Sequence, residues 1–143
     1  MKNFSLYITA ITSMGVCFSG YITFSRFITG TCPLNEPCPY FLGYPACWYG
    51  FALFSVLFVT SVLTLKKVLS TGTATKICIT LGLLGVLFAG YFTIPEVYAF
   101  ISGATYTLGL PTCAYGLIFY AALVILAAME IKYIEMPPAS PMQ

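Results

Sequence analysis

Apolar positions along the chain gather into four long stretches, at about residues 5–27, 43–65, 77–94 and 111–130. Each stretch is close to the roughly 20 helical residues that cross a hydrocarbon core of about 30 Å. The pattern therefore predicts an all-α membrane protein with four transmembrane helices. The first stretch is longer than the apolar region of a secretory signal, and no small-residue cleavage site follows it. We therefore expect it to remain as a helix.

Composition agrees with a membrane protein. Of the 143 residues, 59% are hydrophobic and 7% are charged, and the mean hydropathy is +0.93. A soluble domain carries about 25% charged residues, so this chain has too few charges to cover a surface that faces water. A net charge of +2 without a basic patch gives no indication of a nucleic-acid partner. We expect the partners to be the lipid bilayer and, beyond it, other membrane subunits or a second copy of the chain.

The lysines predict the orientation of the chain in the membrane. In a four-span topology all five fall on one side, and they are Lys2, Lys66, Lys67, Lys76 and Lys132. Basic residues gather on the cytoplasmic side of membrane proteins. The N-terminus and the C-terminus should therefore be cytoplasmic, with the linkers at 28–42 and 95–110 on the outer side.

The two halves of the chain share one motif. It has the form Leu-Gly-x-Pro-x-Cys-x-Tyr-Gly in both copies, at 42–50 and at 108–116. The helix before each copy repeats as well, because 14–23 and 84–93 share Gly, Val, Phe, Gly, Tyr and Thr in the same order. A chance likeness between apolar helices would match Leu with Val, and would not keep Gly, Pro, Cys and Tyr in register.

The repeat therefore predicts the duplication of a two-helix hairpin. The first unit would span 1–70 and the second 71–136, with a disordered proline-rich tail at 137–143. Each unit crosses the membrane twice, so both copies should insert the same way round. They would then be parallel-repeated hairpins, related by a pseudo-twofold axis along the membrane normal.

Six residues of the repeated motif have a physical explanation in helix packing. The first glycine of each copy permits a turn that a Cβ would disfavour, and the proline suits the start of a helix. The last glycine follows a small residue four positions earlier, a spacing that lets helices approach closely in lipid. These expected packing residues are Gly43, Pro45, Gly50, Gly109, Pro111 and Gly116.

The six cysteines divide by their expected depth. Cys32, Cys38, Cys47 and Cys113 fall at or near the outer face, which is an oxidising environment. Cys32 and Cys38 bracket a short loop with two prolines, where a disulfide is geometrically plausible. Cys47 and Cys113 are repeat equivalents that could meet at the axis, or either could meet a loop cysteine. The other two, Cys17 and Cys78, should be buried small hydrophobes. With no His, the usual mixed zinc patterns are absent and we expect no metal site.

One segment resembles a known family. The first two helices of the vitamin K epoxide reductase family are similar to about residues 14–55, through the run Gly-Tyr-Ile-Thr at 20–23, the loop cysteines Cys32 and Cys38, and the residues Gly43, Pro45 and Gly50. The resemblance implies a membrane oxidoreductase that passes electrons from thiols to a quinone, with Cys32 and Cys38 as its shuttle pair. The family's C-x-x-C is not matched, because Gly116 stands where its second cysteine would be, after Cys113.

Three functions remain open. The first is a structural or accessory subunit of a membrane complex, without a recognisable catalytic site or cofactor. It is favoured because the helix centres carry no acid, base or metal ligand. The second is a quinone-linked thiol–disulfide oxidoreductase with Cys32, Cys38, Cys47 and Cys113 as its redox set. Aromatic residues near the outer face could stack on a quinone, although an ordinary interfacial belt explains them as well. The third is a small transporter.

Overall fold

The protein is described from a computed structural model, which covers residues 4–30, 39–105 and 109–135. Within these ranges the main elements are the helices α1 (Phe4–Thr29), α2 (Ala46–Leu65), α3 (Thr71–Ile101) and α4 (Thr112–Glu135). Each helix has a segment that is long and apolar enough to cross a membrane. The prediction of an all-α protein with four transmembrane helices is therefore confirmed. The tail expected at 137–143 lies outside the described residues.

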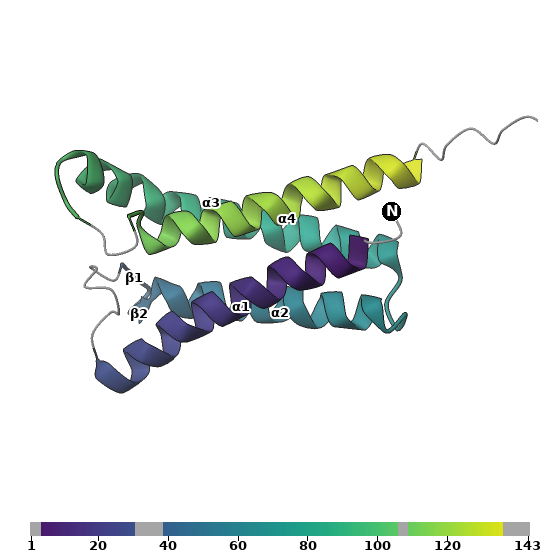
Figure 1. Cartoon of the computed structure of the whole chain (residues 1–143), viewed down its shortest axis with the longest axis horizontal. Helices are drawn as coiled ribbons and strands as arrows, with labels where there is room; N and C mark the ends of the chain where they lie inside the picture. Colours follow the sequence, from purple (N-terminus) through teal and green to yellow (C-terminus); the bar gives the residue numbers. More distant parts are fainter. Residues whose placement is uncertain (1–3, 31–38, 106–108, 136–143) are drawn as a thin grey trace, which may run out of the picture.

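Successive helices run in opposite directions (Figure 1). The connections from α1 to α2 and from α3 to α4 therefore lie at one end of the bundle, which we call the corner end. The connection from α2 to α3 lies at the other end, beside the N-terminus (Figure 1). Helix α1 packs mainly on α2, and α3 mainly on α4, while α2 also contacts α3 and α1 contacts α4. Which side of a membrane the corner end faces, and the origin of the two halves by duplication, stay predictions.

A tight β-hairpin precedes α2, so the helix begins later in the sequence than expected. The short strands β1 (Tyr40–Phe41) and β2 (Tyr44–Pro45) pair through a two-residue turn in which Leu42 and Gly43 have φ of 50° and 86°. Two successive positive φ values are what a type I′ turn requires, and they cannot belong to a right-handed helix. The helix expected from residue 43 therefore begins at Ala46. Gly109 has a similar φ of 80° in the second copy, and α4 begins at Thr112.

Helix α3 is longer than the expected 77–94 at both ends. Ser70 caps its start, since its Oγ accepts a hydrogen bond from the backbone N–H of Thr73 at 3.3 Å. At the other end the helix continues through Pro95 to Ile101, although proline lacks one backbone donor. Membrane helices tolerate such a loss because neighbouring groups satisfy the freed carbonyl. Glu96, which we expected in an outer loop, is therefore helical and only 9% exposed.

Two glycines allow the closest helix contacts. A Cβ at Gly15 in α1 would overlap the ring of Phe54 in α2, and a Cβ at Gly85 in α3 would overlap the ring of Tyr120 in α4. The two rings stack on each other, with centroids 4.3 Å apart and planes 12° apart. In each helical hairpin, α1–α2 and α3–α4, one aromatic ring thus packs on a glycine of the same hairpin. The two rings contact each other between the hairpins.

Gly50 and Gly116 do not mark close helix contacts, contrary to the expectation from their small-residue spacing. A Cβ at either position would have no described heavy atom within 4 Å outside its own helix turn. The reason is that both glycines face a small pocket between the hairpins. Gly43 and Gly109 likewise have open space around them, and their backbone turn explains them instead.

Adding a methyl group at the two glycines that contact these rings should destabilise the bundle. We expect Gly15→Ala and Gly85→Ala to lower the free energy of unfolding by about 1–3 kcal/mol, because overpacking forces the ring or the helix to move. The matched controls Gly50→Ala and Gly116→Ala add the same methyl group to open space and should be neutral or stabilising. Unfolding in mixed micelles under increasing dodecyl sulfate measures all four variants. Equal stabilities for the two pairs would contradict this account of the packing.

Candidate functional site

A small pocket lies between the two hairpins near the corner end, and we call it the axial pocket. Its volume is about 70 Å³. All but one of its lining residues, Phe92, form pairs at equivalent positions of the two repeats. The pairs are Phe18 with Phe88, Ser19 with Ala89, Ala46 with Thr112, Cys47 with Cys113, Gly50 with Gly116, and Phe54 with Tyr120. Repeat-related residues therefore meet around one space.

Cys47 and Cys113 both line the axial pocket. Each cysteine sits in the first turn of its helix, just after Pro45 or Pro111, and each is half-buried. Cys47 is a free thiol, so the structure contains no Cys47–Cys113 disulfide. Thr23 of α1 donates a hydrogen bond to the carbonyl oxygen of Cys47 at 3.4 Å, which links α1 to the start of α2.

The predictions for the other four cysteines differ in how they compare with the structure. Cys32 and Cys38 lie outside the described residues, so their expected disulfide and shuttle role stay predictions. Cys78 is buried as expected, at 1% exposure. The expectation for Cys17 is wrong, because this residue is exposed. The buried face of α1 includes Thr12, Gly15 and Ser19 at helical spacing, and position 17 falls off that stripe.

The buried Ser and Thr side chains of the bundle donate hydrogen bonds to their own helices. Ser19, the serine of the axial pocket, donates to the carbonyl oxygen of Gly15 at 2.6 Å. The other Ser and Thr residues classed as buried also donate to a carbonyl three or four residues earlier, and they are Thr12, Thr60, Ser61, Thr64, Thr75 and Thr93. Apart from the two thiols, the pocket therefore offers mainly apolar surface.

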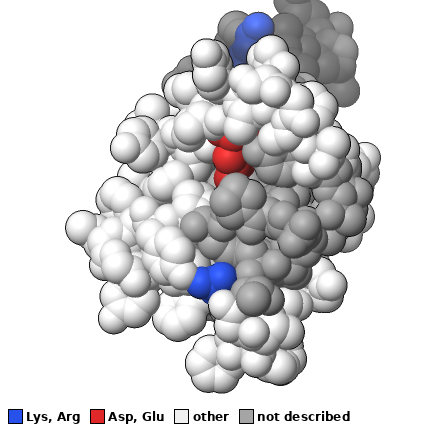
Figure 2. Space-filling model, turned by 90° about the vertical axis from the view of Figure 1, so that its left-hand side faces the viewer, with Lys and Arg blue, Asp and Glu red and all other residues white. Residues whose placement is uncertain are grey.

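Acidic groups are buried toward the two ends of the bundle. Glu96 lies in the last turns of α3, at the corner end, and Glu130 lies in the last turns of α4, at the other end, where it is 3% exposed. Figure 2 looks onto the corner end and shows an acidic group near its centre. In the described ranges, no group of three or more His, Cys, Asp or Glu residues is placed to hold a metal ion.

Several aromatic residues of the corner end pack on one another. The ring of Phe41 lies 5.5 Å from the ring of Phe88 and 5.5 Å from the ring of Tyr49, with both pairs edge to face. The Tyr49 hydroxyl also donates to the carbonyl oxygen of Phe41 at 3.1 Å. These contacts hold the β-hairpin on α2 and α3, which is a structural use for rings that the sequence left open to quinone stacking.

One cation links α1 to the β-hairpin. Nη2 of Arg26 donates to the Tyr40 hydroxyl, and the guanidinium carbon lies 5.6 Å from the centroid of the Tyr40 ring. Figure 2 shows a basic group below the acidic group on this end of the bundle. This contact therefore ties the end of α1 to the β-hairpin that precedes α2.

Comparison with family models, with curated proteins and with solved structures finds no match for this chain. The resemblance to the vitamin K epoxide reductase family therefore rests on the motif residues alone, and it stays a prediction.

The hydroxyl of Tyr120 joins the two hairpins across the axial pocket, since it donates to the carbonyl oxygen of Gly50 at 3.2 Å. We expect Tyr120→Phe to lower the free energy of unfolding by about 0.6 kcal/mol, the usual strength of a hydrogen bond between membrane helices. Tyr98→Phe removes a hydroxyl from a side chain that is 75% exposed and serves as the control. The same micelle unfolding assay applies, and a Tyr120→Phe protein as stable as the Tyr98→Phe protein would exclude a contribution from this bond.

Proposed function

We propose that the chain is a small integral membrane protein that acts as a structural or accessory subunit of a membrane complex. One observation carries the proposal: the hydroxyls of the seven Ser and Thr residues classed as buried in the described helices each donate to a carbonyl of their own helix. Polar groups inside a membrane bundle usually mark a path or a reaction centre when they are available to a substrate. Here these Ser and Thr hydroxyls are used by the helices, so this part of the interior is suited to packing.

The outer surface supports association within the membrane. Large apolar side chains are exposed along every helix, for example Tyr21 at 61%, Leu87 at 72% and Ile125 at 59%. Such a surface fits lipid chains or the apolar face of another membrane helix equally well. The corner end would face outward and both chain ends the cytoplasm. This orientation is supported by Lys66, Lys67 and Lys76 at the opposite end of the bundle.

The repeat-related pairs around the axial pocket support the duplication of one hairpin. Two copies of an ancestral hairpin that packed side by side would place equivalent residues on both sides of the contact. In this account, the stacking of Phe54 on Tyr120 within one chain corresponds to a contact that two identical ancestral hairpins made with each other.

The accessory role predicts a stoichiometric membrane partner. Photo-crosslinking residues placed at Leu87 in α3 and at Ile125 in α4 should report which face meets protein and which meets lipid. We expect the chain, extracted from its source membrane in polymer nanodiscs, to crosslink to one defined membrane protein through one of these faces only. Mass spectrometry identifies the adduct. A chain that is isolated alone and crosslinks only to lipid from both faces would refute the accessory role.

A quinone-linked thiol–disulfide oxidoreductase is the second candidate, and it is favoured by the presence of Cys47 and Cys113 on one pocket. In such a cycle the two thiols form a disulfide, and a quinone takes up the two electrons and two protons and becomes a quinol. A substrate dithiol then reduces the disulfide and is itself oxidised. The axial pocket, at about 70 Å³, is smaller than the roughly 150 Å³ cavity that admits benzene. A quinone ring would therefore have to react at its mouth, or the pocket would have to widen.

Thiol trapping separates the two candidates. We expect Cys47 and Cys113 of the purified protein in liposomes to remain open to alkylation after incubation with a membrane quinone, because an accessory subunit has no use for their oxidation. Peptide mass spectrometry quantifies the label at each position. Simultaneous loss of both labels would support the oxidoreductase, provided that Cys47→Ser preserves labelling of Cys113 and that Cys78→Ser, at a buried position away from the pocket, has no effect.

A further inference from the structure

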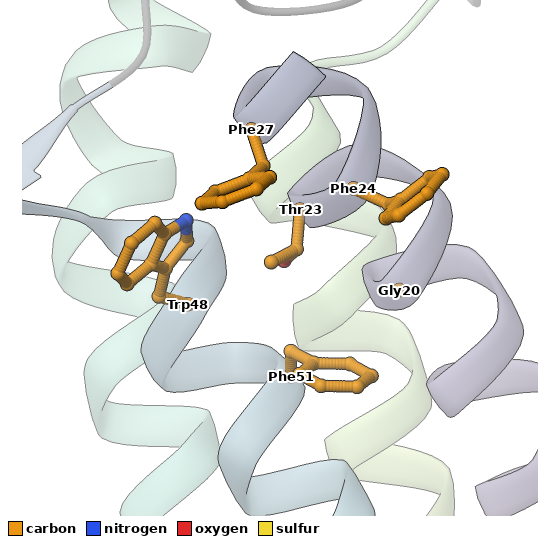
Figure 3. A pocket seen from close by; sticks show the side chains of 6 residues that line it. All are labelled: Gly20, Thr23, Phe24, Phe27, Trp48 and Phe51. Atoms are coloured by element: carbon orange, nitrogen blue, oxygen red, sulfur yellow. The ribbon is translucent and has the colours of Figure 1, made fainter.

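A second hollow lies between α1 and α2 on the outer surface of the bundle, near the corner end. Its volume is about 360 Å³, within the range of about 300–1,000 Å³ typical of ligand sites. It is lined by Gly20, Thr23, Phe24, Phe27, Trp48 and Phe51, and we call it the aromatic groove (Figure 3). Phe27 and Trp48 face one another across the gap, and Phe51 lies further along α2 (Figure 3).

The second hairpin lacks the rings of this groove. Counted along the repeat, Gly20 and Thr23 have the same residues as their equivalents, Gly90 and Thr93. The four rings instead correspond to smaller aliphatic residues, which are Ile94, Val97, Ala114 and Leu117. Because α3 and α4 pack together without these rings, the hairpin fold does not require them. Their presence in the first hairpin alone indicates a role in binding.

The groove opens toward the surroundings and has almost no polar wall. Phe24 and Phe27 are 66% and 74% exposed. Its one hydroxyl, on Thr23, already donates to the carbonyl oxygen of Cys47. An occupant should therefore be an apolar chain that reaches the groove from the bilayer.

A positive charge lies next to the lining residues of the groove along α1, at the corner end. Arg26 follows Thr23 by one helical turn, and its guanidinium contacts Tyr40 in the β-hairpin that precedes α2. Among the described residues it is the only Lys or Arg at the corner end. A guanidinium carries five N–H donors in a fork that fits phosphate oxygens.

We propose that the aromatic groove holds an acyl chain of an anionic phospholipid, whose headgroup phosphate lies beside Arg26. The rings supply contact area for the chain, and the cation selects a lipid with net negative charge over a zwitterionic one. A basic side chain at a membrane surface favours anionic lipid by about fivefold.

Trp48 reports on the groove directly, because it is the only tryptophan of the chain. The protein is placed in phosphatidylcholine vesicles that contain a small fraction of lipid with brominated chains, which quench tryptophan on contact. We expect brominated phosphatidylglycerol to quench Trp48 in a saturable way, at about one fifth of the fraction that brominated phosphatidylcholine needs. Arg26→Gln should abolish the difference between the two headgroups. The double variant Phe24→Ile with Phe27→Val, which installs the residues of the second hairpin, should reduce quenching by both lipids.

A reporter outside the groove provides the control. Trp48→Phe combined with Tyr98→Trp moves the tryptophan to an exposed site on α3, where we expect no headgroup preference. Quenching of Trp48 that is equal for both lipids and linear in their fraction would mean ordinary annular contact and overturn the proposal. No quenching by either lipid would mean that protein covers the groove, which overturns it as well. Trp48 also borders a hollow with Tyr44 and Tyr49 on its other side, so a full preference retained in the double variant would place the lipid there and refute the assigned site.

Discussion

The stack of Phe54 on Tyr120 is the contact on which the arrangement of the two hairpins depends. Lipid tails are as apolar as leucine, so helices in a membrane gain little from hydrophobic burial and associate through close packing instead. Each ring reaches the interface because a glycine on the neighbouring helix, Gly15 or Gly85, leaves room for it. The stacked rings also line the axial pocket, and they thereby set the space that Cys47 and Cys113 share.

The four helices could be predicted from the sequence because a hydrocarbon core imposes one length on every span. Their ends could not, because local chemistry decides them. The positive φ values at Leu42 and Gly43 delay α2, the side chain of Ser70 starts α3 early, and Pro95 fails to end it. Proline is a reliable stop in water, where an irregular backbone is solvated, but in a membrane the helix is the state that satisfies the backbone.

The candidate site was predictable only in part. The repeat identified Cys47 and Cys113 as equivalent residues, and the structure brings both to one pocket. Spacing alone assigned Gly50 and Gly116 to helix packing. This assignment failed because spacing does not tell which side of a helix faces a neighbouring helix. The rings of the aromatic groove received no specific role from composition, since they match an interfacial belt. The signal for them was the difference between the repeats at Phe24, Phe27 and Trp48.

The length of α3 constrains the bilayer that suits this bundle. Its 31 residues extend over about 46 Å, half as long again as a hydrocarbon core of about 30 Å. An average tilt of about 20° shortens this projection only slightly. The charged residues Lys76 and Glu96 divide the helix in a way that resolves the mismatch, because the segment between them rises about 30 Å. Beyond Glu96, α3 continues for five more residues, or about 7.5 Å, whereas the 20 residues of α2 rise only about 30 Å in total.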